Sequence, residues 1–271
     1  MKISTVKGTN DYLPEQVALR DYLQSVILTT YEDAGFSRIS TPAIEDIENL
    51  DKSDGGENLN LIFKILKRGD KLENALKSGE EKDLADMGLR YDLTLPLSRY
   101  YANNRSRLSL PAKCIQIDKV YRAERPQKGR LREFVQCDID IIGSSSILCE
   151  VELIETTAKA LLKIGMKDFT VKVNDRRILR AMLETMGFAE QDLDGVCIVF
   201  DKLDKVGVDG VRAELTEKGY APAAVEALCA TLNGGEMTLE KVAQILPENP
   251  AVQSVSAILS AAQALADAAT A

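Results

Sequence analysis

Residues 120–140 constrain the fold of this chain more than any other segment, because they have the pattern of two strands joined by a short basic loop. Side chains alternate between the two faces of a strand, so every second residue of the second strand shares a face. One face is apolar and belongs in a core. It consists of Val135, Cys137, Ile139 and Ile141. The opposite face is polar, which indicates that it holds a ligand. It consists of Phe134, Gln136, Asp138 and Asp140.

The loop between the two strands is rich in cations. Arg122 precedes it, and Arg125, Lys128 and Arg130 lie within it. Basic residues outnumber acidic ones from 113 to 133, although the net charge of the chain is −8. Cations at a hairpin tip beside a polar strand face suit a bound polyphosphate.

Composition excludes several kinds of chemistry. The chain has 271 residues, of which 45% are hydrophobic and 28% charged, as in ordinary globular proteins with one large or two smaller domains. It has no histidine, which excludes a histidine base, a histidine triad and a histidine metal ligand. The five cysteines are scattered, so we expect buried thiols, no metal site built by the chain itself and a cytoplasmic location. We expect no membrane-spanning segment.

Periodicity predicts the elements before residue 177. A helix is expected from Pro14 to about residue 34, with Leu19 at the start of its apolar stripe. The other members of this stripe are Leu23, Val26, Ile27 and Tyr31. Strands are expected at 36–44, 61–67, 88–93 and 169–174. Pro42 places the first strand at an edge or an interface. No helix or strand is predicted for the charged segment 71–86.

Helical patterns dominate after residue 177. The first helix carries Ile178, Met182 and Leu183 on one face, and Asn174 or Asp175 is expected to cap it. Further helices are expected at 208–218, 222–232, 239–246 and 252–268. We therefore predict two domains, a mixed α+β core at 1–176 and a small helical domain at 177–271.

Four segments together resemble one enzyme family. Residues 120–140 resemble motif 2 of the class II aminoacyl-tRNA synthetases, in detail that of the histidyl-tRNA synthetases. Residues 7–14, 89–96 and 171–177 resemble the same family, in the same order and spacing. The resemblance implies an α+β, class II synthetase-like antiparallel sheet flanked by helices, with a helical insertion domain. It also implies ATP-dependent formation of histidyl-adenylate with Mg²⁺, transfer to tRNA(His), and a homodimer built through motif 1 at residues 14–44.

Arg122 is the residue that we expect to act in catalysis, because a planar guanidinium can hold a carboxylate and the α-phosphate of ATP at once. The resemblance assigns ATP to Arg122, Glu124, Arg130 and Phe134. Glu124 would reach ATP through adenine or an ion, Arg130 the γ-phosphate, and Phe134 the adenine ring. Alternatives are an ion pair of Arg122 with Glu124 or Glu133, a surface ion pair of Glu124, and a core position for Phe134.

Histidine binding is expected at two places. Gln136 and Asp140 lie on one strand face roughly 13 Å apart, and the resemblance gives the α-amino group to Gln136 and the imidazole to Asp140. Asp138, which lies between them, could share in either contact but is ranked below them as a ligand. Asp92 and Thr94 offer acceptors to the substrate ammonium, although both residues also suit a turn before Pro96. Arg90 is a candidate for organising Asp92.

The chain departs from the family in what it lacks. No motif 3, no Arg-Gly-Leu-Asp-Tyr-Tyr-like stretch and no anticodon-binding domain can be recognised, so we expect a truncated fragment without full activity. The alternative is a non-catalytic, synthetase-like regulatory subunit of ATP phosphoribosyltransferase. Two features favour the ligase. One is the full-sized helical insertion, and the other is the presence of all four expected site residues, Arg122, Glu124, Gln136 and Asp140. The strings at 7–14 and 90–94 disfavour another class II ligase.

Overall fold

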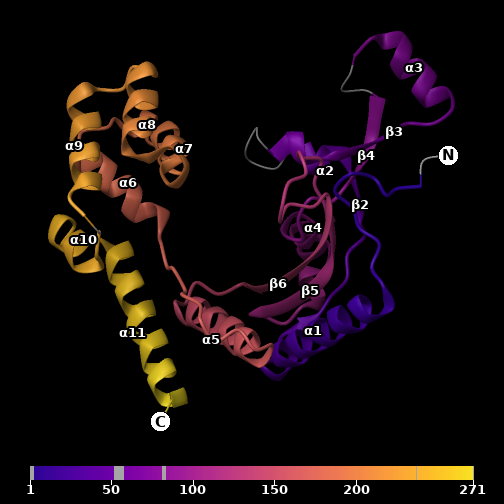
Figure 1. Ribbon diagram of the computed structural model, residues 1–271, viewed down its shortest axis with the longest axis horizontal. Helices are drawn as coiled ribbons and strands as arrows, with labels where there is room; N and C mark the ends of the chain where they lie inside the picture. Colours follow the sequence, from indigo (N-terminus) through magenta and orange to yellow (C-terminus); the bar gives the residue numbers. More distant parts are fainter. Residues whose placement is uncertain (1–2, 52–57, 81–83, 236, 271) are drawn as a thin grey trace. The chain divides into compact units, whose positions relative to one another are not determined.

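The computed structural model describes residues 3–51, 58–80, 84–235 and 237–270 (Figure 1). The chain divides into two compact units. One contains residues 1–145 and 155–168, and the other contains residues 146–154 and 169–271. The boundary that the sequence predicts between the two domains, after residue 176, stays a prediction.

The first sheet of the first unit has the strand order β1-β5-β6. Strand β1 (Ser37–Arg38) pairs in parallel with β5 (Ala112–Tyr121), and β5 pairs antiparallel with β6 (Glu133–Ile142). The pairing of β5 with β6 is continuous from Ala112 opposite Ile142 to Tyr121 opposite Glu133. The hairpin predicted from the sequence is therefore confirmed.

The second sheet is antiparallel, in the order β2-β4-β3. Its strands are β2 (Ile44–Asp46), β4 (Ala85–Leu89) and β3 (Phe63–Leu66). The prediction of one strand over residues 36–44 was wrong, because β1 and β2 belong to different sheets. The strand predicted at 88–93 exists as β4 but lies earlier in the chain, from Ala85 to Leu89. The strand predicted at 169–174 was wrong, because these residues form no strand.

One helix covers the apolar face of the first sheet. Helix α1 (Pro14–Asp33) begins at Pro14, as predicted, and packs against β5 (Figure 1). Near its end, the hydroxyl of Tyr31 and the thiol of Cys137 form a hydrogen bond. Burial raises the pKa of Tyr31 to about 12 and that of Cys137 to about 11, so both groups are neutral. The face of β6 that carries Cys137 is thus the core face.

Shorter helices complete the first unit. They are α2 (Ile47–Asp51), the 3₁₀ turn η1 (Asn58–Leu61), α3 (Asp70–Ser78), α4 (Thr94–Asn104) and η3 (Arg105–Arg107). Helix α3 lies within the charged segment to which the sequence assigned no element. Helix α5 (Leu148–Lys163) belongs partly to each unit.

A buried arginine joins separate parts of the first unit. Only 1% of Arg90 is exposed. Its Nη1 donates to the carbonyl of Thr41 at 2.7 Å, and its Nε donates to the carbonyl of Lys119 at 2.9 Å. Its Nη2 forms an ion pair with Asp118 at 2.8 Å. Arg90 therefore holds the chain that follows β4 against β5, which agrees with an organising rather than a substrate-contacting position.

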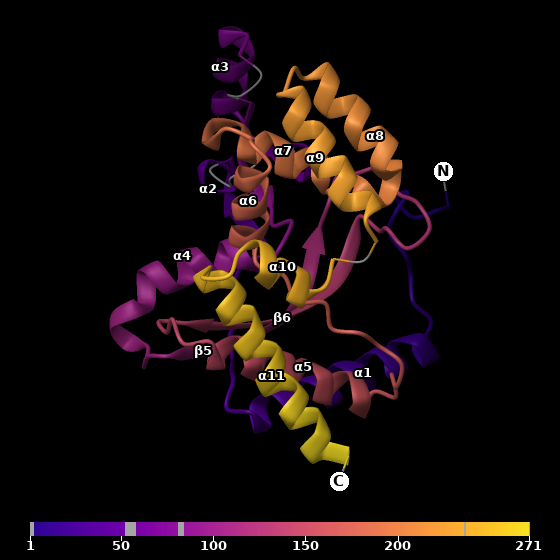
Figure 2. The ribbon, with the colours of Figure 1, turned by 90° about the vertical axis from the view of Figure 1, so that its left-hand side faces the viewer.

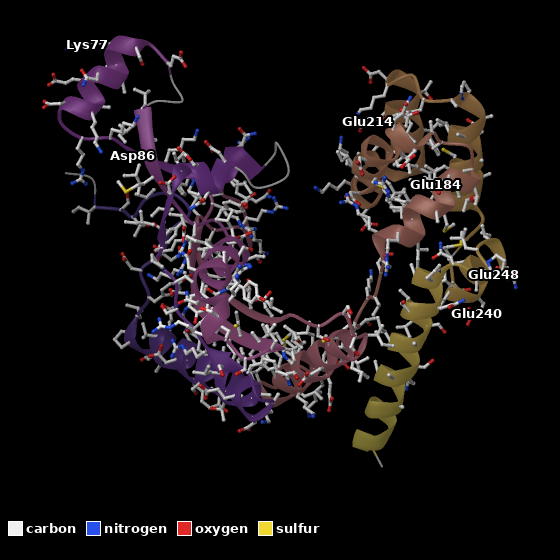
Figure 3. All side chains as sticks on the ribbon, turned by 180° about the vertical axis from the view of Figure 1, so that it is seen from behind. Lys77, Asp86, Glu184, Glu214, Glu240 and Glu248 are labelled. Carbon is white, nitrogen blue, oxygen red and sulfur yellow. The ribbon has the colours of Figure 1, made fainter. Side chains whose placement is uncertain are left out.

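The second unit is helical and packs around two apolar clusters (Figure 2). Its helices are α6 (Arg176–Thr185), α7 (Leu193–Phe200), α8 (Leu203–Glu217), α9 (Pro222–Asn233), α10 (Leu239–Ile245) and α11 (Pro250–Thr270), with the 3₁₀ turn η4 (Glu190–Asp192). Asp175 caps α6 by accepting from the amide of Arg177, as one of the two predicted caps. Glu214 of α8, labelled in Figure 3, accepts from Lys202 at 2.7 Å. Helix α7 was not predicted.

We expect Arg90→Ala to lower the free energy of unfolding by about 3 kcal/mol, because it removes a buried guanidinium and leaves several carbonyls without their donor. Urea unfolding followed by circular dichroism measures this change. Arg107→Ala, at an exposed arginine of η3, is the control and should change stability by less than about 0.5 kcal/mol. An equally small effect of Arg90→Ala would show that the network does not stabilise the fold.

Candidate active site

The polar face of the β5–β6 hairpin is the first part of the site. Residues directly opposite each other in an antiparallel pair share a face. Gln116 lies opposite Asp138, and Asp118 lies opposite Gln136. Gln116 and Asp118 point to the same side as the polar residues of β6, away from α1. This side faces the segment that follows β4.

Besides the bond from Arg90 to Lys119, two side chains of the hairpin donate hydrogen bonds to the backbone of that segment. Gln116, which is 2% exposed, donates from Nε2 to the carbonyl of Leu93 at 2.9 Å. Arg122 donates from Nε to the carbonyl of Tyr91 at 3.1 Å. Tyr91 and Leu93 are themselves buried, whereas Asp92 between them is half-buried. The backbone on both sides of Asp92 is therefore bound to the hairpin that carries the polar face.

Asp92 and Thr94 do not lie on a strand. Strand β4 ends before these residues, and Thr94 begins α4 and is exposed. The Oδ1 atom of Asp92 accepts from the amide of Leu95 at 3.1 Å, which is the turn-capping alternative. This bond uses one carboxylate oxygen of Asp92 and leaves the second for a ligand.

Gln136 and Asp140 lie on one face, as the sequence predicts, and each has a buried acceptor. In the part of the chain that the structure describes, Oε1 of Gln136 and Oδ2 of Asp140 are inaccessible to solvent and have no hydrogen-bond partner. A buried acceptor without a donor costs roughly 1–3 kcal/mol. An ammonium or a ring N–H would supply the donors that these two atoms lack.

Asp138 lies at the centre of the charged groups, although the sequence ranked it below its neighbours. Burial raises the pKa of Asp138, the charges of Asp140 and Asp92 raise it further, and Arg122 opposes them. Burial also raises the pKa of Asp140. Asp138 shares its strand face with Gln136 and Asp140, as the sequence indicates, and its lower rank as a ligand stays a prediction.

Arg122 lies at the loop end of the hairpin, directly after β5, and forms no ion pair with a carboxylate among the described residues. Its guanidinium carbon lies 5.1 Å from the centre of the Phe134 ring. The alternative ion pairs of Arg122 are not formed. Glu133 instead pairs with Lys119 at 2.8 Å, and Glu124 pairs with Arg130 at 3.1 Å. The terminal nitrogens of Arg122 are therefore suited to an anionic ligand.

The hairpin tip forms a second, more exposed part of the site. A tight turn pairs Gln127 with Arg130, and Gly129 within it has φ +80°, which glycine adopts without strain. A cavity of about 440 Å³ lies beside the turn and is lined by Glu124, Arg125, Pro126, Gln127 and Arg130. The Glu124–Arg130 contact is the surface ion pair considered as an alternative for Glu124.

Comparisons with known proteins agree with this geometry. A family described as histidyl-tRNA synthetase matches residues 8–271. The histidine–tRNA ligase of Leifsonia xyli is 45% identical over 275 aligned residues, which cover 97% of this chain and 63% of the relative. The crystal structure of histidyl-tRNA synthetase from a Nostoc species superposes with a TM-score of 0.76 at 25% identity, over 98% of this chain and 59% of that one.

A second solved structure resembles this chain in its fold alone. A structure from Bacillus halodurans, described as an ATP phosphoribosyltransferase regulatory subunit/histidyl-tRNA synthetase, has a TM-score of 0.76 at 19% identity and covers 97% of this chain and 65% of that one. The two sheets and the motif 2 hairpin therefore define a class II aminoacyl-tRNA synthetase fold. Within this class, the chain belongs to the histidyl-tRNA synthetase family. It spans 63% of the length of the Leifsonia relative. In the described residues, no helix combines the length and apolarity needed to cross a membrane.

We expect Asp138→Asn and Asp140→Asn each to raise the melting temperature by about 2 °C at pH 7.5. The folded state raises the pKa of both carboxyls, so it binds more protons than the unfolded state, and stability falls as pH rises through the folded pKa. An amide carries no charge and avoids this cost. Thermal denaturation at several pH values measures the effect.

The gain should shrink as the pH is lowered and the native carboxyls take up protons. Asp168→Asn, at an exposed aspartate, is the matched control and should leave the melting temperature unchanged at each pH. A lower melting temperature for Asp138→Asn at pH 7.5 would show instead that its ionised carboxylate stabilises the fold.

Proposed function

We propose that this chain takes part in the ATP-dependent activation of histidine as histidyl-adenylate and in its transfer to tRNA(His). The observation that supports this most strongly is the polar hairpin face. It carries the unpartnered acceptors of Gln136 and Asp140, and the charge of Arg122 acts on Asp138, which lies between them on the same strand face. The membership of the histidyl-tRNA synthetase family supports the same substrate.

The proposed chemistry needs no general base. An oxygen of the histidine carboxylate attacks the α-phosphorus of ATP, the new O–P bond forms, and the bond to pyrophosphate breaks. The attacking group is already an anion, which suits a chain without histidine side chains. The protein must align two anions and neutralise the charge that develops between them. Arg122 has the permanent charge and the planar shape for this role.

The amino-acid end of the site is rich in negative charge. Asp138 interacts with both Asp140 and Asp92, and Arg122 is the cation that opposes them at Asp138. We propose that Asp92 and Gln136 receive the α-ammonium group and that Asp140 receives a ring N–H of the imidazole. Asp138 adds negative charge beside both groups. Thr94, which is exposed at the start of α4, stays a predicted ligand of the ammonium.

The nucleotide end would engage the hairpin tip. Phosphate oxygens would draw Arg130 away from Glu124, because a polyphosphate offers Arg130 more negative charge than one carboxylate does. Glu124 would then be available for the Mg²⁺ that accompanies ATP, since protein-bound Mg²⁺ usually needs only one or two carboxylates besides phosphates and water. Phe134 already faces Arg122 and stays the predicted platform for adenine.

A homodimer is the assembly that we propose. On one side of helix α1 the apolar side chains of Leu19 and Tyr22, three positions apart, are exposed, whereas Leu13 and Val17 lie on another side. Leu19, the first residue of the predicted apolar stripe, is 58% exposed. An apolar helix face that the described part of one copy leaves uncovered is suited to a second copy. The cytoplasmic location also stays a prediction.

The regulatory subunit of ATP phosphoribosyltransferase is the alternative function. The Bacillus structure shares only the fold at 19% identity. The Leifsonia relative, at 45% identity, is named as a ligase. Together with the intact set of Arg122, Glu124, Gln136 and Asp140, this favours the ligase.

We expect the chain to bind histidine and Mg²⁺·ATP, and Arg122→Ala to weaken binding of both by about 100-fold, because the variant lacks the charge that both anions share. Isothermal titration calorimetry measures the two affinities. Arg107→Ala is the control and should bind both ligands like the unchanged chain. If the chain binds another amino acid in preference to histidine, the proposed substrate is wrong.

We expect Leu19→Glu and Tyr22→Glu to convert a dimer into a monomer, since each buries a charge at the proposed interface. Sedimentation equilibrium measures the mass. Val206→Glu changes an exposed apolar residue outside α1 and should leave the dimer intact. A dimer that resists both α1 variants would place the interface elsewhere.

A further inference from the structure

A short N-terminal segment, residues 7–10, lies against the base of the motif 2 hairpin, and we call it the strap. The carbonyl of Gly8 accepts from the backbone amide of Arg132 at 2.7 Å. Gly8 has φ +91°, a conformation that residues with a side chain rarely adopt. A Cβ atom at this position would lie 2.7 Å from Cγ of Pro126 and 3.0 Å from Cγ of Arg132. Both the conformation and the close contact therefore require glycine.

The strap is held in shape by its own hydrogen bonds. The amide of Thr9 donates to the carbonyl of Val6 at 2.9 Å, and the hydroxyl of Thr9 donates to the same carbonyl at 2.8 Å. The hydroxyl of Thr5 donates to the carbonyl of Thr9 at 3.0 Å. Gly8 thus sits inside a closed turn, and a side chain at this position would push against the hairpin.

Arg132 connects the strap to two residues of the proposed nucleotide site. Its carbonyl accepts from the amide of Arg122 at 2.9 Å, and its Nε donates to the carbonyl of Glu124 at 3.2 Å. On the opposite arm of the hairpin, the amide of Ala123 donates to the carbonyl of Leu61 at 2.8 Å. The hairpin base is therefore fixed on both sides, by the strap and by η1.

We propose that Gly8 is a positioning residue, which sets the place of Arg122 and Glu124 through Arg132 without touching a substrate. This inference rests on the proposed function for its consequence, because those two residues meet ATP there. Displacement of a catalytic group by about 1 Å can cost about 100-fold in rate. The sequence contains Gly8 within the family-like segment at 7–14, but no sequence pattern indicates its contact with Pro126.

The first measurement does not depend on any ligand. Hydrogen exchange of backbone amides compares the unchanged chain with Gly8→Ala and Gly165→Ala. Gly165 also has φ +91°, but a Cβ atom added there would have no neighbour within 4 Å, so this position matches the backbone strain without the contact. We expect the Arg132 amide to exchange at least about 10-fold faster in Gly8→Ala and at the native rate in Gly165→Ala.

The second measurement is the affinity for Mg²⁺·ATP by calorimetry. Gly8→Ala should weaken binding by about 10-fold, and Gly165→Ala should leave it unchanged. Pro126→Gly removes the ring that a Cβ at position 8 would strike, so the double variant Gly8→Ala/Pro126→Gly should recover part of the affinity.

Three outcomes would overturn the proposed role of the strap. The first is an Arg132 amide that exchanges at the native rate in Gly8→Ala. The second is faster exchange throughout the first unit in Gly8→Ala. The third is an equal increase in the exchange rate of the Arg132 amide in Gly165→Ala. Faster exchange confined to the hairpin, in a chain that binds no ATP, would support the strap contact and contradict the proposed function instead.

Discussion

The pairing of β5 with β6 is the interaction on which the rest of the site depends. The register that places Gln116 opposite Asp138 determines which side chains face the segment after β4 and which face α1. A shift of one residue would turn Gln136, Asp138 and Asp140 toward α1 and would turn Cys137 toward the polar side. The bond between Tyr31 and Cys137 on one side, and the bond between Gln116 and Leu93 on the other, are compatible with a single register.

The site is built at a cost in stability. Carboxylates with pKa values raised by burial, and two buried acceptors without donors in the described chain, oppose folding. The buried network around Arg90 and Gln116 offsets this cost by satisfying carbonyls of three separate segments. Proteins commonly leave polar groups unpaired where function requires them and compensate with stabilising contacts elsewhere.

The sequence predicted those parts of the fold that are periodic over many residues. The alternation through residues 134–141 identified both faces of β6, and the helical stripe of residues 178–183 identified α6. The single strand predicted at 36–44 failed for a physical reason. The carbonyls of Thr41 and Pro42 accept from the guanidinium of Arg90, far along the chain, instead of pairing with a strand. Local patterns contain no information about such a partner. The Gly8 contact with Pro126 was unpredictable for the same reason, whereas the place of Asp138 followed from parity alone.

A crystal structure of the chain with histidine bound would test the proposed histidine site most directly. We predict the α-ammonium group within about 3 Å of Oε1 of Gln136 and a ring nitrogen within about 3 Å of Oδ2 of Asp140, because these buried atoms have no donors of their own in the described chain. Histidine bound on another surface, with the polar face of β6 unchanged, would contradict this assignment.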